Sequence, residues 1–256
     1  MKLNLNIPQS WNELSTRQLK KIAKLLDSNI KGTYFDYKVF AILLNARWFK
    51  VWKLWKLVFL VNNVAFSEFK KEYCAWFYEK IGLTTFIPTI KIKDKILQSP
   101  ADRITNLTID EFAHADDLYI GWINKHQLQH IHYLAAVLYR ELDENGKRVP
   151  FDKTELDERA KLFKKIDRKT LLTIVLSYQG CRSHLESKFK YVFPKRKSLE
   201  TAKKSTAKSS GFGKVIMQIA RSGNTFGAYD QTRTTNLYVF LSEYDELLRI
   251  EKQRPK

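Results

Sequence analysis

Glycine, proline and cysteine are scarce in this sequence. The 256 residues include only 9 glycines and 6 prolines, which argues against a fold rich in strands and loops, because both residues are typical of turns. The 2 cysteines, Cys74 and Cys181, cannot form a disulfide framework. Both lie in apolar segments, where a buried thiol is the expected state.

Long hydrophobic runs are also missing. The longest charge-free apolar stretches, residues 39–46 and 57–67, are shorter than the roughly 20 residues with which a helix crosses a membrane. Near the N-terminus, Leu3, Leu5 and Ile7 alternate with polar residues, unlike the continuous apolar core of a signal peptide. We therefore expect a cytoplasmic protein without a membrane span, and a short extended arm that ends at Pro8.

Positive charge is what the sequence has in excess. The 45 Lys and Arg residues outnumber the 27 Asp and Glu residues, which gives a net charge of +18 and a pI near 9.7. Such an excess favours an acidic partner: nucleic acid, an anionic membrane face or an acidic protein surface. The hydrophobic fraction of 44% is too high for a disordered chain, so we expect a folded core.

Apolar residues recur mostly at helical spacing, which predicts a mainly α fold. Ser15 with Gln18, and Thr108 with Glu111, form capping-box patterns that start helices. Asp110 and Glu111 also suit the first turn of a helix, where acids complement its dipole. Further helices are predicted over residues 66–81, 127–139, 156–165, 168–189 and 215–220, and from 237 toward the C-terminus. Residues 87–95 are predicted to be a short exposed strand or an extended loop.

We predict an irregular multi-helix bundle with three parts. Residues 1–189 are expected to form a helical body that begins with the extended arm. Residues 190–213 contain hardly any core residue and many bases, which is typical of a flexible, solvated linker. Residues 214–256 are expected to form a small C-terminal helical unit.

Two basic segments suggest contacts with nucleic acid. Around residue 52, four aromatic residues share one helical stripe, with Lys and Arg residues beside it: Trp48, Trp52, Trp55 and Phe59. Aromatic side chains of this kind can stack on the nucleobases of a single strand. Bases on the linker would contact phosphates without sequence preference. In this interpretation the contact residues are Arg47, Lys50, Lys53, Lys56, Lys195, Arg196, Lys197, Lys203, Lys204 and Lys208. A buried aromatic face with solvated lysines explains the same pattern without a partner.

Residues that could carry catalysis or hold a metal form no convincing motif. His126, His130 and His132 have an H-x3-H-x-H spacing, in which the first two would share a helical face, as in zinc sites. No acid lies between them, and His126 stands at a predicted helix start. His184 follows Cys181 by three residues, but the segment reads as a buried helix. We therefore expect no enzyme activity, no catalytic residue and no cofactor.

Four segments carry a resemblance to a known group of proteins. Residues 7–18 contain Pro8-Gln9-Ser10-Trp11-Asn12-Glu13-Leu14, a Pro-x-Ser-Trp-x-Glu-Leu entry into a first helix. The other segments are residues 107–116, 133–140 and 235–241. Together they resemble small α-helical proteins from tailed-phage and prophage morphogenesis clusters, and the nearest functional label is a tail-assembly-chaperone-like protein.

This resemblance implies a non-enzymatic function. A protein of this kind would bind a tape-measure or tail-tube protein during tail assembly, in the cytoplasm of the bacterial host. The present chain departs from the group in being long and strongly basic. The alternative is a nucleic-acid-binding accessory protein that works through the linker and the Trp/Lys helix.

Overall fold

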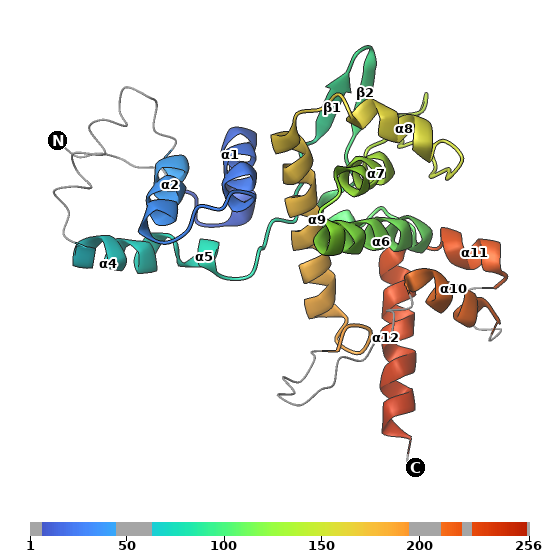
Figure 1. The fold of residues 1–256 in the computed structure, drawn as a ribbon. Coiled ribbons are helices and arrows are strands. Elements are labelled where there is room, and N and C mark those ends of the chain that lie inside the picture. The colour runs from blue at the N-terminus through green and yellow to red at the C-terminus, as the bar shows by residue number, and fades with distance from the viewer. Residues whose placement is uncertain (1–6, 45–62, 195–210, 222–226, 255–256) are drawn as a thin grey trace. The chain divides into compact units, whose positions relative to one another are not determined.

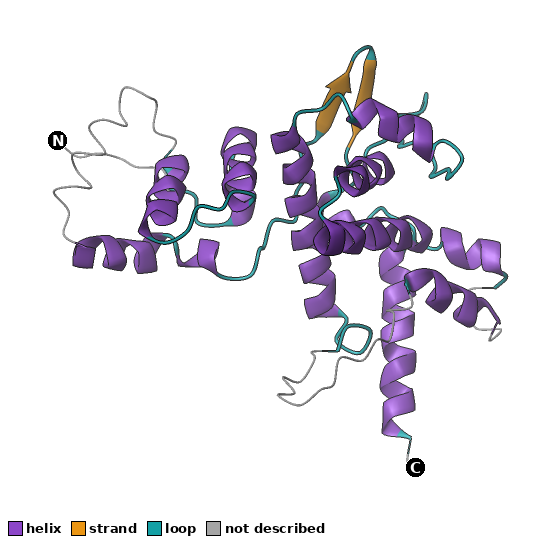
Figure 2. Ribbon diagram, in the orientation of Figure 1, coloured by secondary structure: helices purple, strands orange, loops and turns teal. Residues whose placement is uncertain are grey.

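The computed structural model describes residues 7–44, 63–194, 211–221 and 227–254. Over these ranges it contains eleven α-helices and one two-stranded sheet (Figures 1 and 2). The predicted mainly α fold is confirmed. Among the described helices, none combines the length and apolar character needed to cross a membrane. Most of the predicted extended arm and most of the predicted linker lie outside the described residues.

The chain divides into two compact units, and each is described by itself. The first comprises Met1–Thr85 with Asp167–Ser183, and the second comprises Phe86–Ile166 with His184–Lys256. The elements of the first unit are a 3-10 turn (Trp11–Glu13), α1 (Thr16–Leu26), α2 (Thr33–Leu43), α4 (Asn63–Tyr73), α5 (Ala75–Tyr78) and most of α9 (Arg168–Lys188).

Helix α1 begins with the predicted capping box. The Ser15 side chain accepts a hydrogen bond from the Gln18 backbone, and Gln18 Oε1 accepts one from Ser15 N at 3.0 Å. The amide of Gln18 is buried and also donates to the carbonyls of Ile42 and Leu43, at 3.2 and 2.9 Å. Gln18 therefore both caps α1 and fixes it against the end of α2.

Aromatic rings and a buried thiol contribute to the core of the first unit. Trp11 is buried, stacks on Phe77 at a centroid distance of 4.9 Å and meets Trp76 edge-on at 5.6 Å. The helix predicted over residues 66–81 is interrupted at Cys74, whose non-helical backbone separates α4 from α5. The Cys181 thiol is buried and donates to the Thr84 carbonyl at 3.4 Å, which is the structural role expected of it.

The second unit combines a β-hairpin with helices. Its elements are β1 (Thr89–Ile92), β2 (Lys95–Gln98), a 3-10 turn (Asp102–Ile104), α6 (Ile109–Lys125), α7 (Leu128–Leu138), α8 (Leu156–Phe163), the end of α9, α10 (Phe212–Arg221), α11 (Tyr229–Thr234) and α12 (Leu237–Gln253). The extended segment predicted at residues 87–95 contains β1, which pairs antiparallel with β2.

Tyr139, which directly follows α7, lies at the centre of the core of this unit. Its ring meets Phe86 and Phe163 at centroid distances of 6.5 and 6.2 Å, and its hydroxyl donates to the Ile87 carbonyl at 2.8 Å. Burial raises the pKa of Tyr139 far above its usual range. The hydroxyl therefore stays protonated and serves as a donor.

Buried and half-buried charged side chains gather at the C-terminal end of α7. Arg148 donates to the Leu138 carbonyl at 2.7 Å and Arg159 to the Ala136 carbonyl at 3.4 Å, so two cations meet the negative end of the helix dipole. Burial, reinforced by the nearby charge of Arg140, lowers the pKa of Arg148 to about 10. Arg140 itself pairs with Glu111 of α6.

Candidate functional site: a groove between the C-terminal helices

Backbone hydrogen bonds attach the start of α12 to the start of α6. Thr108 and Asn236 face each other in an antiparallel bridge, where Ile109 N donates to Thr235 O at 3.0 Å and Leu237 N donates to Leu107 O at 2.9 Å. Asn236 caps α12, because its side-chain oxygen accepts from Tyr238 N at 2.9 Å. Its amide donates to Thr105 O at 2.8 Å, so one residue starts the helix and fixes it in place.

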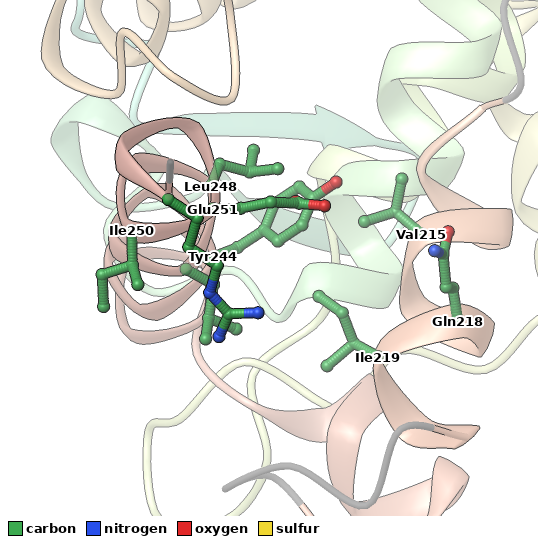
Figure 3. A pocket seen from close by; sticks show the side chains of 9 residues that line it. Val215, Gln218, Ile219, Tyr244, Leu248, Ile250 and Glu251 are labelled. Atoms are coloured by element: carbon green, nitrogen blue, oxygen red, sulfur yellow. The ribbon is translucent and has the colours of Figure 1, made fainter. Parts of the chain in front are cut away.

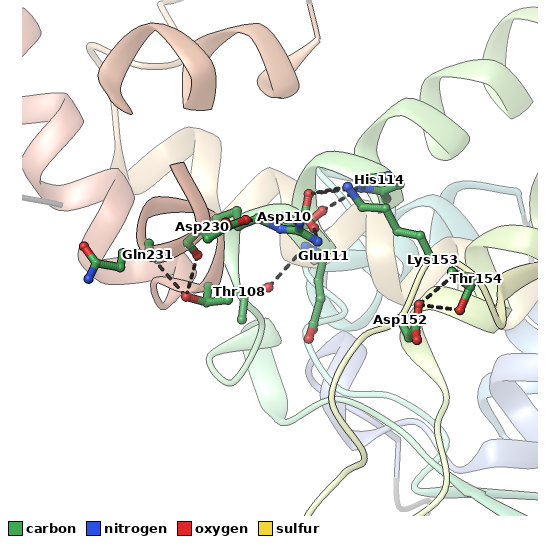
Figure 4. Close-up of polar contacts among 11 residues, drawn as sticks. Thr108, Asp110, Glu111, His114, Asp152, Lys153, Thr154, Asp230 and Gln231 are labelled. Carbon is green, nitrogen blue, oxygen red and sulfur yellow. Dashed lines mark hydrogen bonds and ion pairs between the residues drawn. The ribbon is translucent and has the colours of Figure 1, made fainter. Parts of the chain in front are cut away.

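A buried carboxylate attaches α11 to the same end of α6. Asp110 lies 3.1 Å from Lys153 Nζ and 3.2 Å from Arg233 of α11, and its Oδ1 is 3.6 Å from His114 Nδ1 (Figure 4). Three cationic or ionisable side chains from different segments therefore converge on one acid. The sequence predicted only a helix-dipole role for Asp110.

Helix α10 is held against α6 through Phe212. The Phe212 ring meets Phe112 of α6 edge-on at 5.1 Å and lies 5.6 Å from Phe193. Farther along α10, Ile216 and Ile219 are buried. The helix was predicted over residues 215–220 and is longer at its N-terminal end, because Phe212 adds an apolar contact one turn earlier.

An apolar groove of about 450 Å³ opens between α10 and α12 (Figure 3). Three polar residues line it together with six apolar ones, which are Val215, Ile219, Tyr244, Leu247, Leu248 and Ile250. The polar residues are Gln218, Glu251 and Arg254. Burial, with a further contribution from the charge of Glu251, raises the pKa of Tyr244, so its hydroxyl is protonated at neutral pH.

The groove leaves large apolar side chains in contact with solvent. Leu247 is 39% exposed and Ile250 is 43% exposed. Met217 of α10 and Val239 of α12 are also exposed but do not line the groove. The geometry suits the docking of apolar side chains between two helices. No cluster of catalytic groups lines the groove.

The ten bases predicted to contact nucleic acid are not described by the structure. Arg47, Lys50, Lys53 and Lys56 lie in residues 45–62, and the six bases between Lys195 and Lys208 lie in residues 195–210. Their role stays a prediction.

The three histidines considered as zinc ligands have separate structural positions. His126 was expected at a helix start but instead ends α6, in the left-handed conformation with φ 51°, and its ring meets Trp122 at 5.4 Å. His130 and His132 follow in α7, and His130 lies directly against Gly121. Within the described ranges, no group of three His, Cys, Asp or Glu residues could hold a metal ion.

Reasoning from the sequence missed the groove, although its two walls were partly predicted. The apolar spacing of both α10 and α12 was recognised, and each helix buries one apolar face. Of the two exposed apolar residues in the groove, Ile250 was not part of the apolar stripe predicted along α12, whereas Leu247 was. Their exposure depends on where α10 and α11 lie, and α11 was not predicted.

Comparisons with known proteins identify no relative. No family model matches the chain, and neither the curated proteins nor the solved structures give a significant match to it.

Proposed function

We propose that this chain is a non-enzymatic protein-binding factor that holds an amphipathic helix of a partner in the groove between α10 and α12. The observation that carries the proposal is the apolar lining of this groove, in which Leu247 and Ile250 remain open to solvent. Burying such side chains against a partner is favourable by about 25 cal/mol per Å² of apolar surface. A helix with apolar residues at i, i+3 or i+4, and i+7 would match the groove.

Two charged residues that line the groove indicate which charges a partner helix should carry. Glu251 and Arg254, on successive turns near the end of α12, both line the groove. A partner helix that places a base toward Glu251 and an acid toward Arg254 would be favoured over one with the opposite order. These contacts would set the direction in which the helix lies.

In this proposal the partner is a tape-measure or tail-tube protein, and the process is the assembly of a phage or prophage tail. The four segments that resemble tail-assembly chaperones support this choice. A coiled-coil tape-measure protein would also present helices with regular apolar stripes, as the groove requires.

Co-expression with the tape-measure or tail-tube protein encoded nearest to this gene tests the proposal. The wild-type chain should co-purify with one of them, and Leu247→Asp should abolish co-purification. Val239→Asp is the matched control, because Val239 is exposed on the same helix outside the groove. Failure of the wild type to co-purify, or equal loss with both variants, would count against the groove.

The alternative function, as a nucleic-acid-binding accessory protein, is supported by the net charge of +18. It would act through the bases of segments 47–56 and 195–208. A gel-shift experiment titrated with salt tests it, because phosphate contacts weaken steeply as salt rises. The absence of a shift at low salt would remove this alternative.

A further inference from the structure

Helix α1 presents a surface of four bases and no acid. Its sequence places Arg17, Lys20, Lys21 and Lys24 opposite a buried face that contains Leu19, Ile22 and Leu25. These bases stand three or four residues apart, so they are close neighbours on one side of the helix. We refer to these four residues as the α1 basic face.

Nearby acids in the first unit are already engaged elsewhere. Asp27 receives two hydrogen bonds from Arg168, at 3.0 and 3.2 Å, and Asp36 pairs with Lys70 at 2.7 Å. Asp167 caps the start of α9 by accepting from Thr170 N at 3.1 Å, and the charge of Lys20 adds to the hydrogen bonds that lower its pKa. Among the described residues, no carboxylate lies within ion-pair distance of the α1 basic face.

The field of Lys20 reaches the Asp167 carboxylate, but none of the four bases forms an ion pair with a described residue, so they repel one another. Like charges three and four residues apart destabilise a helix by about 0.2–0.5 kcal/mol per pair. The helix is nevertheless rigidly held, because Gln18 caps it and donates to the carbonyls of Ile42 and Leu43. Four cations carried on one side of a helix whose backbone is held in place suit a ligand with regularly spaced negative charge.

We propose that the α1 basic face binds the phosphate backbone of nucleic acid. From Arg17 to Lys24 the helix rises about 10 Å. Phosphates of one DNA strand are spaced by about 3.4 Å along the duplex axis, so the face spans about three of them. The first unit as a whole contains 17 bases and 7 acids, which adds a long-range attraction of the same sign.

A nucleic acid fits this surface better than a membrane does. Helices that insert at a membrane surface need a free apolar face, and the apolar face of α1 is buried in the core. The α1 basic face shares no residue with the groove or with segments 47–56 and 195–208, so its variants test it without altering either.

Fluorescence anisotropy with a labelled 20-base-pair DNA duplex tests the proposal. The full chain is compared with the triple variant R17Q/K21Q/K24Q over 50–200 mM salt. Loss of three phosphate contacts should make the negative slope of log K (the association constant) against log salt shallower by about 3. It should also weaken binding at 50 mM salt at least about tenfold. The control variant K31Q/K71Q/K125Q removes the same charge from exposed lysines elsewhere and should retain the wild-type slope to within about 1.

Three results would overturn the proposal. They are no binding of the wild-type chain at 50 mM salt, equal slopes for the two triple variants, and equally tight binding of wild type to polyglutamate or to vesicles of anionic lipid. Glutamine keeps a good helix propensity, and circular dichroism of each variant verifies that the fold is retained.

Discussion

Glu111 Oε1 lies 2.8 Å from Arg140 Nη2, and neither side chain is more than 5% exposed. Burial raises the pKa of Glu111 and lowers that of Arg140, while each charge favours the ionised form of the other. Glu111 Oε2 and Arg140 Nε and Nη1 are buried without a hydrogen-bond partner in the described part of the chain. Desolvation of this pair is therefore only partly compensated.

Removing one member of this pair should be worse than removing both. Arg140→Met leaves the Glu111 carboxylate buried without its partner, and we expect a loss of about 3–5 kcal/mol in the free energy of unfolding. Glu111→Leu combined with Arg140→Met should recover most of that loss, because both charges of the pair are then removed together and Arg148 loses the repulsion of Arg140 as well as the attraction of Glu111. Urea denaturation of both variants measures the difference, and a double variant no more stable than the single one would contradict the prediction.

Gly180 should not tolerate a side chain. A Cβ at this position would clash with the backbone carbonyl of Leu83, which cannot rotate away as a side chain can. We expect Gly180→Ala to destabilise the chain by about 1–3 kcal/mol. Gly213→Ala is the control, since a Cβ there meets no atom within 4 Å. Gly213→Ala should leave the stability unchanged or raise it by up to about 1 kcal/mol. Thermal denaturation of both variants measures the difference.

Asp110→Asn should loosen the attachment of α11 to α6. The substitution removes the charge that Lys153 and Arg233 share. Both cations are partly exposed, so we expect a modest loss of about 1–2 kcal/mol. In hydrogen-exchange measurements, the variant should exchange the amides of α11 faster than the wild type does, while the amides of α7 should change less. Asp230→Asn is a matched control, because Asp230 is exposed and contacts Arg233 only at 3.6 Å; equal effects of the two variants would refute the role of Asp110.

Acidification should destabilise the second unit through His132. Burial lowers the pKa of His132, and the charge of Lys164 lowers it further. The unfolded chain then binds a proton at higher pH than the folded chain does, so stability falls as pH drops below about 6.5. The urea midpoint of His132→Gln should change less between pH 7.5 and 5.5 than that of the wild type. An unchanged pH dependence in this variant would show that His132 does not contribute.

Local signals predicted the helices well, and long-range pairing explains the errors. Ser15 and Gln18 start α1 as expected, because all partners of a capping box lie within one turn. Thr108 also caps its helix, accepting from Glu111 N at 3.3 Å. The Glu111 side chain points instead to Arg140, which no pattern within the helix could indicate.

The candidate site was less predictable than the helices that form it. Amphipathic spacing identified α10 and α12, but a groove exists only where two apolar faces fail to meet. That arrangement depends on Asp110, Arg233 and the bridge between Thr108 and Asn236, which join segments distant in sequence. The short helix α11 escaped prediction because its six residues contain hardly any apolar pattern.

The bridge between the starts of α6 and α12 has a consequence for biosynthesis. Asn236 donates to Thr105, a residue that leaves the ribosome 131 positions earlier. Contacts of such separation form late, because a long loop must close before they can contribute. The start of α6 therefore lacks these backbone partners until residues 235–237 have been synthesised, although Glu111 and Asp110 can already pair with Arg140 and Lys153. A chain interrupted before residue 235 would leave the Ile109 amide and the Leu107 carbonyl without the partners that they have in the folded protein.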